Sequence, residues 1–254
     1  MPEVEALAEF LRDQLTDRVV ARVEVAAINV LKTYDPPPTA LEGLQVTGVT
    51  RHGKWLDVDV DGLHLVVHLS RAGWLRWSPA LPTAPLRPGG RNPVALRVRL
   101  APEGAEADDR PAGFDLTEAG TQKRLAVHLV RDPSAIPGIA TLGPDPLADS
   151  FDLAAFSALL AGSRQQVKGL LREQSVLAGV GNAYSDEVLH VARLSPYASA
   201  GKLGPDEVET LFAALKDTLR GAVAAAGGRP AGELKDAKRA GMRVHGRTGQ
   251  PCPV

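Results

Sequence analysis

Apolar residues recur along the chain with two different periods, which divide it into two parts. In the first 15 residues, Val4, Leu7, Leu11 and Leu15 stand at helical spacing and predict a short amphipathic helix. From there to residue 130 the pattern is typical of β-strands. The segments predicted to be strands are 18–26, 44–50, 54–60, 63–69, 95–100 and 125–130. Between two of them, Asp61-Gly62 is typical of a two-residue hairpin turn.

Helical periodicity governs the second part of the chain. Residues 151–160 predict one helix. Pro205 begins another, with Asp206 and Glu207 in its first turn, as is usual at a helix N-terminus. Its apolar stripe is formed by Val208, Leu211, Phe212, Leu215, Leu219, Ala222 and Val223. Strands followed by helices predict an α+β fold or two domains.

Proline- and glycine-rich segments separate the predicted elements. Residues 79–93 and 101–113 predict exposed loops. The stretch 132–149 contains four prolines and predicts a linker between the strand-rich and the helical parts.

Composition limits the classes of protein to which the chain can belong. Its 254 residues are 44% hydrophobic, which suffices for a core in one large or two modest domains. Neither a membrane-spanning apolar run nor a signal peptide is recognisable, so we expect a soluble cytoplasmic protein. Cys252 is the single cysteine, which excludes an internal disulfide.

Charge is distributed unevenly along the chain. The net charge of −1 argues mildly against a nucleic-acid-binding protein. However, residues 161–254 hold 13 Lys and Arg against 9 Asp and Glu. A basic end on a neutral protein is compatible with a localised DNA-binding surface, and equally with a solvated basic face.

The segment 174–187 predicts a helix, a tight glycine turn and a second helix. Gly179 and Gly181 permit positive φ angles and close backbone approach. Asn182 stands where its side chain can cap the second helix. Such a turn presents backbone N–H groups and a short amide to one external point, where a phosphate can bind. An ordinary helical hairpin produces the same pattern.

This segment contains the motif Gln-x-x-x-Ala-Gly-x-Gly-Asn-x-Tyr-x-x-Glu. The motif closely resembles the helix–two-turn–helix (H2TH) of the formamidopyrimidine-DNA glycosylase/endonuclease VIII (Fpg/Nei) family. The resemblance extends over nearly the whole chain. Its other segments are Met-Pro-Glu at 1–3, Arg-His-Gly-Lys-Trp-Leu at 51–56, Leu-Gly-Pro-Asp-Pro-Leu at 142–147 and Val-His-Gly-Arg-Thr-Gly-Gln-Pro-Cys-Pro at 244–253.

The resemblance implies an N-terminal β-sandwich with a leading helix, joined to a helical domain. We therefore expect a catalytic-type domain over 1–131, a linker over 132–150, an H2TH domain over 151–241 and the start of a zinc finger over 242–254. It also implies a monomeric, nucleoid-associated DNA repair protein whose partner is duplex DNA with a damaged base or an abasic site.

The implied catalytic residues are Pro2, Glu3 and Lys54. In the family the exposed proline amine attacks C1′ of the damaged nucleotide and forms an iminium ion, and lyase steps then cut the strand. An α-amino group with a pKa of about 7.7–8.0 is partly neutral, and hence nucleophilic, at cellular pH. Glu3 would do acid–base work, and Lys54 would contact phosphate and assist base removal. From the residues alone, Pro2 and Glu3 also suit the first turn of a helix.

Residues implied to bind DNA fall into two groups. Phosphate contacts are expected from Lys168, Gly179, Gly181, Asn182 and Arg247. The second group is Arg71, Lys123 and Arg124, with Gln122 beside them, which are expected either to fill the gap left by an extruded base or simply to contact phosphates. They replace the family's methionine and Arg-Phe pair, so we expect a lesion specificity that differs from that of the best-known members.

The chain differs from the usual sequence of the family at both of its ends. The family usually begins Met-Pro-Glu-Leu-Pro-Glu-Val-Glu, whereas this chain begins Met-Pro-Glu-Val-Glu. Pro2 then aligns either with the catalytic proline or with the second one. A complete family member carries zinc on four cysteines. Cys252 matches the first of these, so we expect an incomplete finger and no cofactor in the chain as given.

Two alternatives to an active glycosylase and AP lyase remain open from the sequence. One is a catalytically weakened or inactive relative that binds damaged DNA without cutting it. The other is a protein- or RNA-binding helical hairpin, since ribosomal proteins carry similar glycine turns. The Lys54 segment and the Gly246-Arg247 tail argue against the second alternative.

Overall fold

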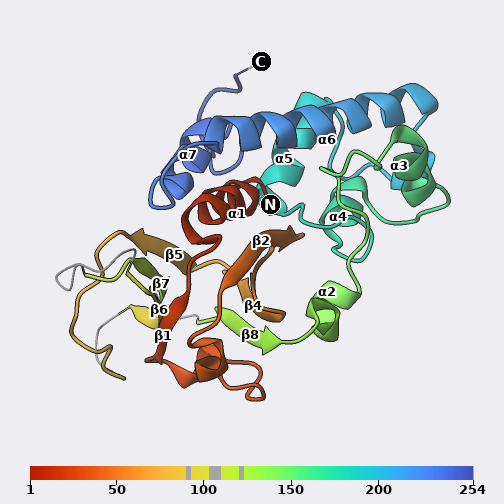
Figure 1. The fold of residues 1–254 in the computed structure, drawn as a ribbon. Helices are drawn as coiled ribbons and strands as arrows, with labels where there is room; N and C mark the ends of the chain where they lie inside the picture. Colours follow the sequence, from red (N-terminus) through yellow and green to blue (C-terminus); the bar gives the residue numbers. More distant parts are fainter. Residues whose placement is uncertain (90–92, 103–109, 120–122, 254) are drawn as a thin grey trace. The chain divides into compact units, whose positions relative to one another are not determined.

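The computed structural model describes residues 1–89, 93–102, 110–119 and 123–253, which form two compact units (Figure 1). A helical unit comprises Met1–Ala6, Thr141–Gly227 and Leu234–Val254. A β-rich unit comprises Leu7–Ala140 and Gly228–Glu233. The chain therefore passes from one unit to the other after Ala6, Ala140, Gly227 and Glu233.

The β-rich unit is built from two antiparallel four-stranded sheets. One has the order β1-β6-β7-β5 and the other β2-β3-β4-β8. The strands are β1 (Val20–Val25), β2 (Val46–His52), β3 (Trp55–Val60), β4 (Leu63–His68), β5 (Gly73–Ser78), β6 (Val94–Leu100), β7 (Gly113–Glu118) and β8 (Ala126–Val130). Together with the helices of the other unit, they confirm the predicted α+β class.

All six predicted strands are present, but β5 and β7 were not predicted. Each of these two strands is six residues long and follows or precedes a loop rich in proline and glycine. Leu75 in β5 and Phe114 and Leu116 in β7 are buried. So few apolar positions give a weak period-2 signal. Part of the predicted loops 79–93 and 101–113 lies outside the described residues.

The predicted hairpin at Asp61-Gly62 is confirmed. Val60 pairs with Leu63 across the turn, and the φ angles of Asp61 and Gly62 are +50° and +79°. Positive φ at both central residues is what the favoured type I′ hairpin turn requires.

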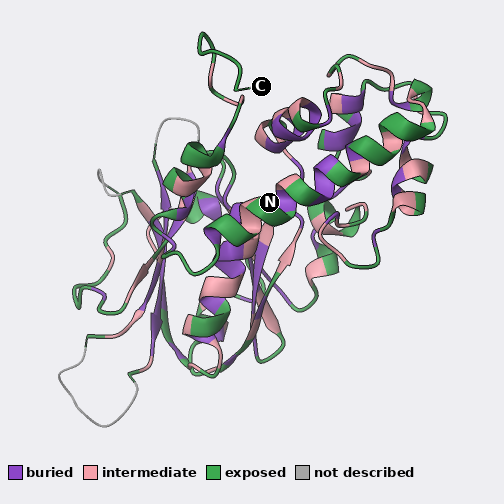
Figure 2. Cartoon of the chain, turned by 90° about the horizontal axis from the view of Figure 1, so that it is seen from above, coloured by how far each residue is buried: buried purple, intermediate pink, exposed green. Residues whose placement is uncertain are grey.

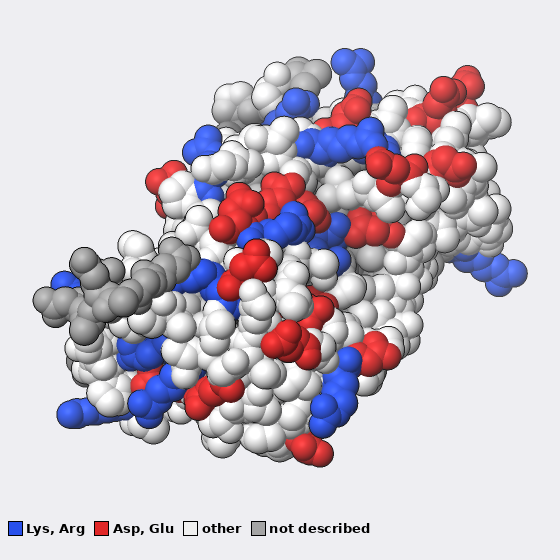
Figure 3. All heavy atoms as spheres, in the orientation of Figure 1, with Lys and Arg blue, Asp and Glu red and all other residues white. Residues whose placement is uncertain are grey.

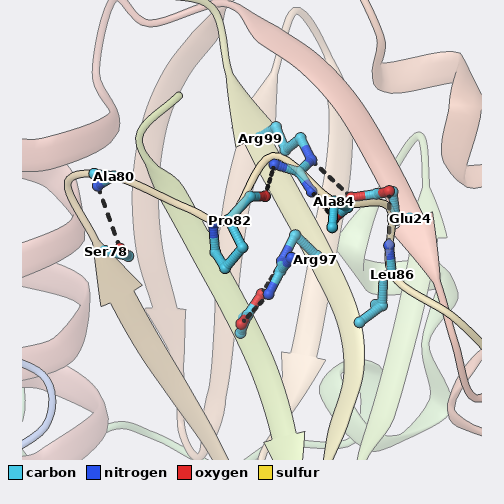
Figure 4. A network of polar contacts seen from close by, with 9 residues as sticks. Glu24, Ser78, Ala80, Pro82, Ala84, Leu86, Arg97 and Arg99 are labelled. Atoms are coloured by element: carbon cyan, nitrogen blue, oxygen red, sulfur yellow. Dashed lines mark hydrogen bonds and ion pairs between the residues drawn. The ribbon is translucent and has the colours of Figure 1, made fainter. Parts of the chain in front are cut away.

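An ion-pair network holds a loop over the β1-β6-β7-β5 sheet (Figure 4). Arg99 Nε donates to Glu24 Oε2 at 2.7 Å, and the same guanidinium donates to the carbonyls of Pro82 and Ala84 at 2.7 and 3.0 Å. Glu24 also accepts the backbone N–H of Leu86 at 3.1 Å. Burial alone would raise the pKa of Glu24, but the Arg99 and Leu86 hydrogen bonds hold it below its usual value.

Helices and short turns complete the two units. They are α1 (Pro2–Leu15), α2 (Pro137–Ala140), α3 (Leu153–Leu160), α4 (Val167–Arg172), α5 (Asn182–Val191), α6 (Pro205–Ala226) and α7 (Leu234–Gly241), with 3₁₀ turns at Ile28–Val30, Pro38–Leu41, Pro133–Ala135 and Ala200–Lys202. The predicted N-terminal helix is confirmed by α1. The predicted helices at 151–160 and from Pro205 are confirmed by α3 and α6.

Local capping explains where α3 and α6 begin. The Asp152 carboxylate accepts the N–H of Ala155 at 2.8 Å, which is the usual N-cap bond. At α6, Glu207 accepts the N–H of Gly204 at 2.9 Å. Both contacts satisfy N–H groups that a helix start leaves without partners.

Buried apolar side chains alternate with exposed polar ones along the elements of each unit (Figure 2). In the β-rich unit, Leu7, Leu11 and Leu15 of α1 are fully buried. In the helical unit, the fully buried core side chains include Phe156, Leu171, Leu177, Val180, Val188, Leu211, Leu215 and Leu219. Among the described helices, none is long and apolar enough to cross a membrane.

Candidate functional site

The glycine turn between α4 and α5 is organised by one glutamine. Gln174 Nε2 donates to the carbonyls of Arg172 and Val180 at 2.7 and 2.8 Å, and its Oε1 accepts the N–H of Gly179 at 2.9 Å. Gly179 has a φ of +86°, which favours glycine. A Cβ at this position would also collide with the Met1 side chain. The turn therefore depends on both Gln174 and Gly179.

Asn182 does not cap α5, so this prediction was wrong. Gly181 is the N-cap residue, with an extended φ of −127°, and Asn182 is the first helical residue. The Gly181 backbone adopts the N-cap conformation without needing a side-chain hydrogen bond. The Asn182 side chain is exposed and lies at the start of the helix, where a helix favours anions.

Lys168 is part of a three-residue cluster on the helical unit. Its Nζ lies 2.6 Å from Asp186 Oδ1, and His245 Nδ1 lies 2.8 Å from Asp186 Oδ2. Burial would raise the pKa of Asp186, but hydrogen bonds from Lys168 and His245 lower it. Lys168, a predicted DNA-steering residue, is thus fixed beside the helix that starts at Asn182.

Glu187 anchors the C-terminal tail, which sequence reasoning did not foresee. Its buried carboxylate accepts the N–H groups of Arg243, Val244 and His245 at 2.7, 3.0 and 2.8 Å. Two residues further on, half-buried Arg247 donates to the carbonyl of Met242 at 3.3 Å and to Gln250 at 3.4 Å. The H2TH segment and the tail that carries Arg247 are therefore held together.

Cys252 does not stand in a set of metal ligands. Its Sγ is exposed and lies 3.4 Å from His190 Nε2. Among the described residues, no group of three or more His, Cys, Asp or Glu could hold a metal. One thiol and one imidazole do not fit a four-ligand structural zinc site.

Pro2 and Glu3 lie at the start of α1, within the helical unit. Both are buried, and the carbonyl of Met1 accepts the N–H groups of Val4 and Glu5 at 2.8 and 3.0 Å. The Met1 side chain is part of the helical core and packs against Gly179. The structure thus brings Met1, which directly precedes the predicted catalytic pair, to the glycine turn.

The Glu3 carboxylate is surrounded by hydrogen-bond donors. Its Oε2 lies 3.4 Å from the α-amine of Met1, its Oε1 forms an ion pair with Lys238, and it accepts the hydroxyl of Tyr184. Burial would raise the pKa of Glu3, but the amine and Lys238 lower it. Burial and the Glu3 charge in turn raise the pKa of Tyr184.

Lys54 lies in the β-rich unit, in the two-residue turn between β2 and β3. Gly53 has a φ of +59°, and His52 pairs with Trp55 across the turn. Burial, with the nearby charge of Lys54, lowers the pKa of His68 to about 4. His68 is therefore neutral near pH 7, and its ring centre lies 4.7 Å from that of Trp55.

Two predicted gap-filling segments are joined by hydrogen bonds. Ser70, at a φ of +55°, donates to the carbonyl of Arg124 at 2.7 Å, and His68 Nδ1 lies 3.0 Å from Ser70 Oγ. Buried Glu118 accepts the N–H groups of Arg124 and Leu125 at 2.5 and 2.7 Å. The three predicted residues Arg71, Lys123 and Arg124 are exposed. Gln122 lies outside the described residues.

Basic and acidic side chains are interspersed on the face drawn in Figure 3. Anion binding on this face would therefore depend on local arrangements of donors rather than on a broad basic surface.

Comparisons with known proteins agree on one family. The profile of the formamidopyrimidine-DNA glycosylase N-terminal domain matches residues 1–126, and that of the H2TH domain of the same enzymes matches residues 142–231. Formamidopyrimidine-DNA glycosylase of Moorella thermoacetica is 34% identical over 261 residues, which cover 100% of this chain and 90% of that protein.

Further similar proteins show the same assignment. An uncharacterised formamidopyrimidine-DNA glycosylase-like protein of Mycobacterium tuberculosis is 50% identical over 113 residues, 44% of this chain and 70% of that protein. The crystal structure of MutM (Fpg) from Thermus thermophilus is 29% identical, with a TM-score of 0.76 over 100% of this chain and 90% of that one. A Lactococcus lactis Fpg complex with DNA containing an abasic site has a TM-score of 0.83 at 24% identity and coverage of 100% and 90%, and shows a shared fold. The chain belongs to the formamidopyrimidine-DNA glycosylase family.

Proposed function

We propose that the protein is a base-excision DNA repair glycosylase that binds duplex DNA with a damaged base or an abasic site. The observation that carries this proposal is the match of both family domains to one chain. Relatives named formamidopyrimidine-DNA glycosylase span the whole chain, and proteins of the same fold have been solved with lesion-containing DNA. We infer that it acts as a monomer.

Binding to the DNA backbone is assigned to the helical unit. Exposed Asn182, the Gly179–Gly181 turn, Lys168 and the Arg247 tail would contact phosphates on either side of the lesion. In the β-rich unit, exposed Arg71, Lys123 and Arg124 would occupy the space left by the extruded nucleotide, by stacking and hydrogen bonding. The hydrogen bonds through Ser70 and Glu118 support this assignment because they order both segments.

The proposed chemistry is base removal followed by β-elimination. Once Met1 is removed, the neutral amine of Pro2 attacks C1′, and the base leaves with the electron pair of the glycosidic bond. Loss of the amine proton and cleavage of the C1′–O4′ bond, with a proton going to O4′, then open the sugar and leave an iminium ion at C1′. Loss of the C2′ proton and departure of the 3′ phosphate cut the strand. Glu3 serves in proton transfer, and Lys54 contacts phosphate and assists base removal.

A second candidate function is recognition of damaged DNA without cleavage. It is favoured by the burial of Pro2 as the first residue of α1, because a nucleophile must be presented to C1′. The domain boundaries proposed for either function are 1–131, 132–150, 151–241 and 242–254. Zinc would belong to a complete four-cysteine finger, of which Cys252 would be one ligand.

Borohydride trapping separates the two functions. Duplex DNA with a single abasic site is incubated with the protein and with Pro2→Gly, after removal of Met1 has been checked by mass. A covalent adduct mapped to Pro2 supports the lyase. Binding to the same DNA with no adduct supports the non-cleaving protein.

A further inference from the structure

A lysine that the sequence did not single out lies at the carboxylate of Glu3. Lys238, on α7, forms an ion pair with Glu3, whose side chain is 10% exposed, whereas that of Lys238 is 35% exposed. The Lys238 ammonium also lies 5.3 Å from the ring centre of Tyr184, a distance that allows a cation–π contact. Lys238 therefore joins Glu3 and Tyr184, two groups that also contact each other.

The charged and polar groups that face Glu3 come from three parts of the helical unit. They are the Met1 α-amine at the chain start, the Tyr184 hydroxyl on α5 and the Lys238 ammonium on α7. While Met1 is present, the two carboxylate oxygens have separate cationic partners, since Oε1 faces Lys238 and Oε2 faces the Met1 amine. The Met1 amine is lost when Met1 is removed, as the proposed chemistry requires, whereas Lys238 stays in the chain. Donors and positive charges at both oxygens favour the ionised carboxylate.

We propose that Lys238 is a positioning residue for the reaction: its ammonium group fixes the Glu3 carboxylate in one orientation and in its anionic form. This inference rests on the proposed function, in which Glu3 takes part in proton transfer, and it makes that role specific. An anionic carboxylate accepts a proton and stabilises a neighbouring cation such as an iminium ion, whereas a protonated one donates. Glu3 therefore enters the reaction as the proton acceptor.

The next residue on α7 offers a matched control. Arg239 carries the same charge, but its side chain is 86% exposed and pairs at 3.8 Å with Asp236 on its own helix. Replacing Arg239 removes one positive charge from α7 and leaves the Glu3 ion pair intact. Any effect of a change in net charge on DNA binding appears in both variants, and an effect on Glu3 appears only at position 238.

The first test is an NMR titration of the Glu3 side-chain carboxyl carbon in the DNA-free protein, assigned by comparison with Glu3→Gln. Lys238→Met is expected to raise the pKa of Glu3 by about one to three units. Lys238→Arg and Arg239→Met should each leave it near the wild-type value. A shift in Lys238→Met no larger than that in Arg239→Met overturns the proposal. If Lys238→Met does not fold, as judged by thermal unfolding, Lys238→Gln takes its place.

The second test is the pH profile of strand cleavage at an abasic site under single-turnover conditions. The acidic limb should move to higher pH in Lys238→Met by the same amount as the NMR titration, and return in Lys238→Arg. If the acidic limb of the cleavage profile does not move in Lys238→Met although the NMR titration of Glu3 does, the positioning role is overturned and the proposed function still stands. Absence of cleavage by the wild-type protein overturns the proposed lyase activity, and with it the reaction role of Lys238.

Discussion

Charged residues are used differently in the two units. In the β-rich unit, the pairs Arg99–Glu24 and Arg97–Asp115 have side chains no more than 13% exposed. The first holds a loop on a sheet, and the second joins the neighbouring strands β6 and β7. In the helical unit, Lys168, Asp186 and Lys238 are 24–35% exposed; Lys168 pairs with Asp186, and Lys238 pairs with Glu3. Buried pairs serve the fold, and half-exposed pairs remain accessible to a ligand.

The largest effect is expected where a buried pair is broken. Arg99→Met leaves the Glu24 carboxylate and the carbonyls of Pro82 and Ala84 without their donor. Breaking a buried pair by removing one partner costs about 3–5 kcal/mol. We expect a loss of this size in the free energy of unfolding, measured by urea denaturation. Exposed Arg76 on β5 provides the control, since Arg76→Met should change stability by less than about 0.5 kcal/mol. Equal losses in both variants would contradict a structural role for the Arg99 pair.

A smaller loss is expected at the glycine turn. Gly179→Ala places a Cβ at a φ of +86° and against the Met1 side chain, and a non-glycine residue in the left-handed region costs about 1–2 kcal/mol. Thermal unfolding should show this loss, and affinity for abasic DNA should fall as well. Gly232→Ala, at a position with open space around the Cβ, is the comparison. An unchanged affinity in Gly179→Ala would remove the turn from the binding site.

Exposed Asn182 and half-buried Arg247 of the helical unit should affect binding more than stability. Arg247→Met removes one charge, so the slope of log K against log salt concentration should become shallower by about 0.9. Asn182→Ala removes a neutral contact, so affinity should fall several-fold with the slope unchanged. Fluorescence anisotropy with abasic duplex DNA at several salt concentrations measures both quantities. A changed melting temperature in Asn182→Ala would conflict with the absence of a capping bond from this side chain.

At neutral pH the smallest effect is that of His68 in the β-rich unit, because it appears only below about pH 6.5. The pKa of His68 is about 4 in the folded protein and about 6.5 in an unfolded chain. Between these values the unfolded chain binds more protons, so stability rises as pH rises from about 4 to 6.5 and is then constant. His68→Gln should flatten the dependence of the unfolding free energy on pH in this window. A slope as steep as that of the wild type would show that other groups cause it.

Local patterns predicted most of the fold but few of the contacts that build the site. Period-2 and helical spacing identified six strands and the helices α1, α3 and α6. The reason is that an element with one buried face carries apolar residues at regular short intervals along the sequence. The strands β5 and β7 left too few apolar positions. The capping role given to Asn182 failed because Gly181 adopts the N-cap conformation without a side-chain bond.

Contacts between segments far apart along the chain could not be predicted from the spacing of residues in a single sequence. The pair Glu3–Lys238, the three N–H groups bound by Glu187 and the bridge from Ser70 to Arg124 each join residues far apart along the chain. Such pairs depend on tertiary packing and not on spacing. Family resemblance placed Glu3, Asn182 and Arg247 in a site, but it did not indicate which side chains hold them.

Neither unit can be obtained by a single cut in the gene. Residues 228–233 belong to the β-rich unit, and the indole N–H of Trp74 donates to the carbonyl of Ala231 at 2.8 Å. An expressed fragment ending at Ala140 would lack this acceptor, and one beginning at Thr141 would lack the six N-terminal residues that pack with the helices. Dissection of the protein therefore requires fragments that reassociate.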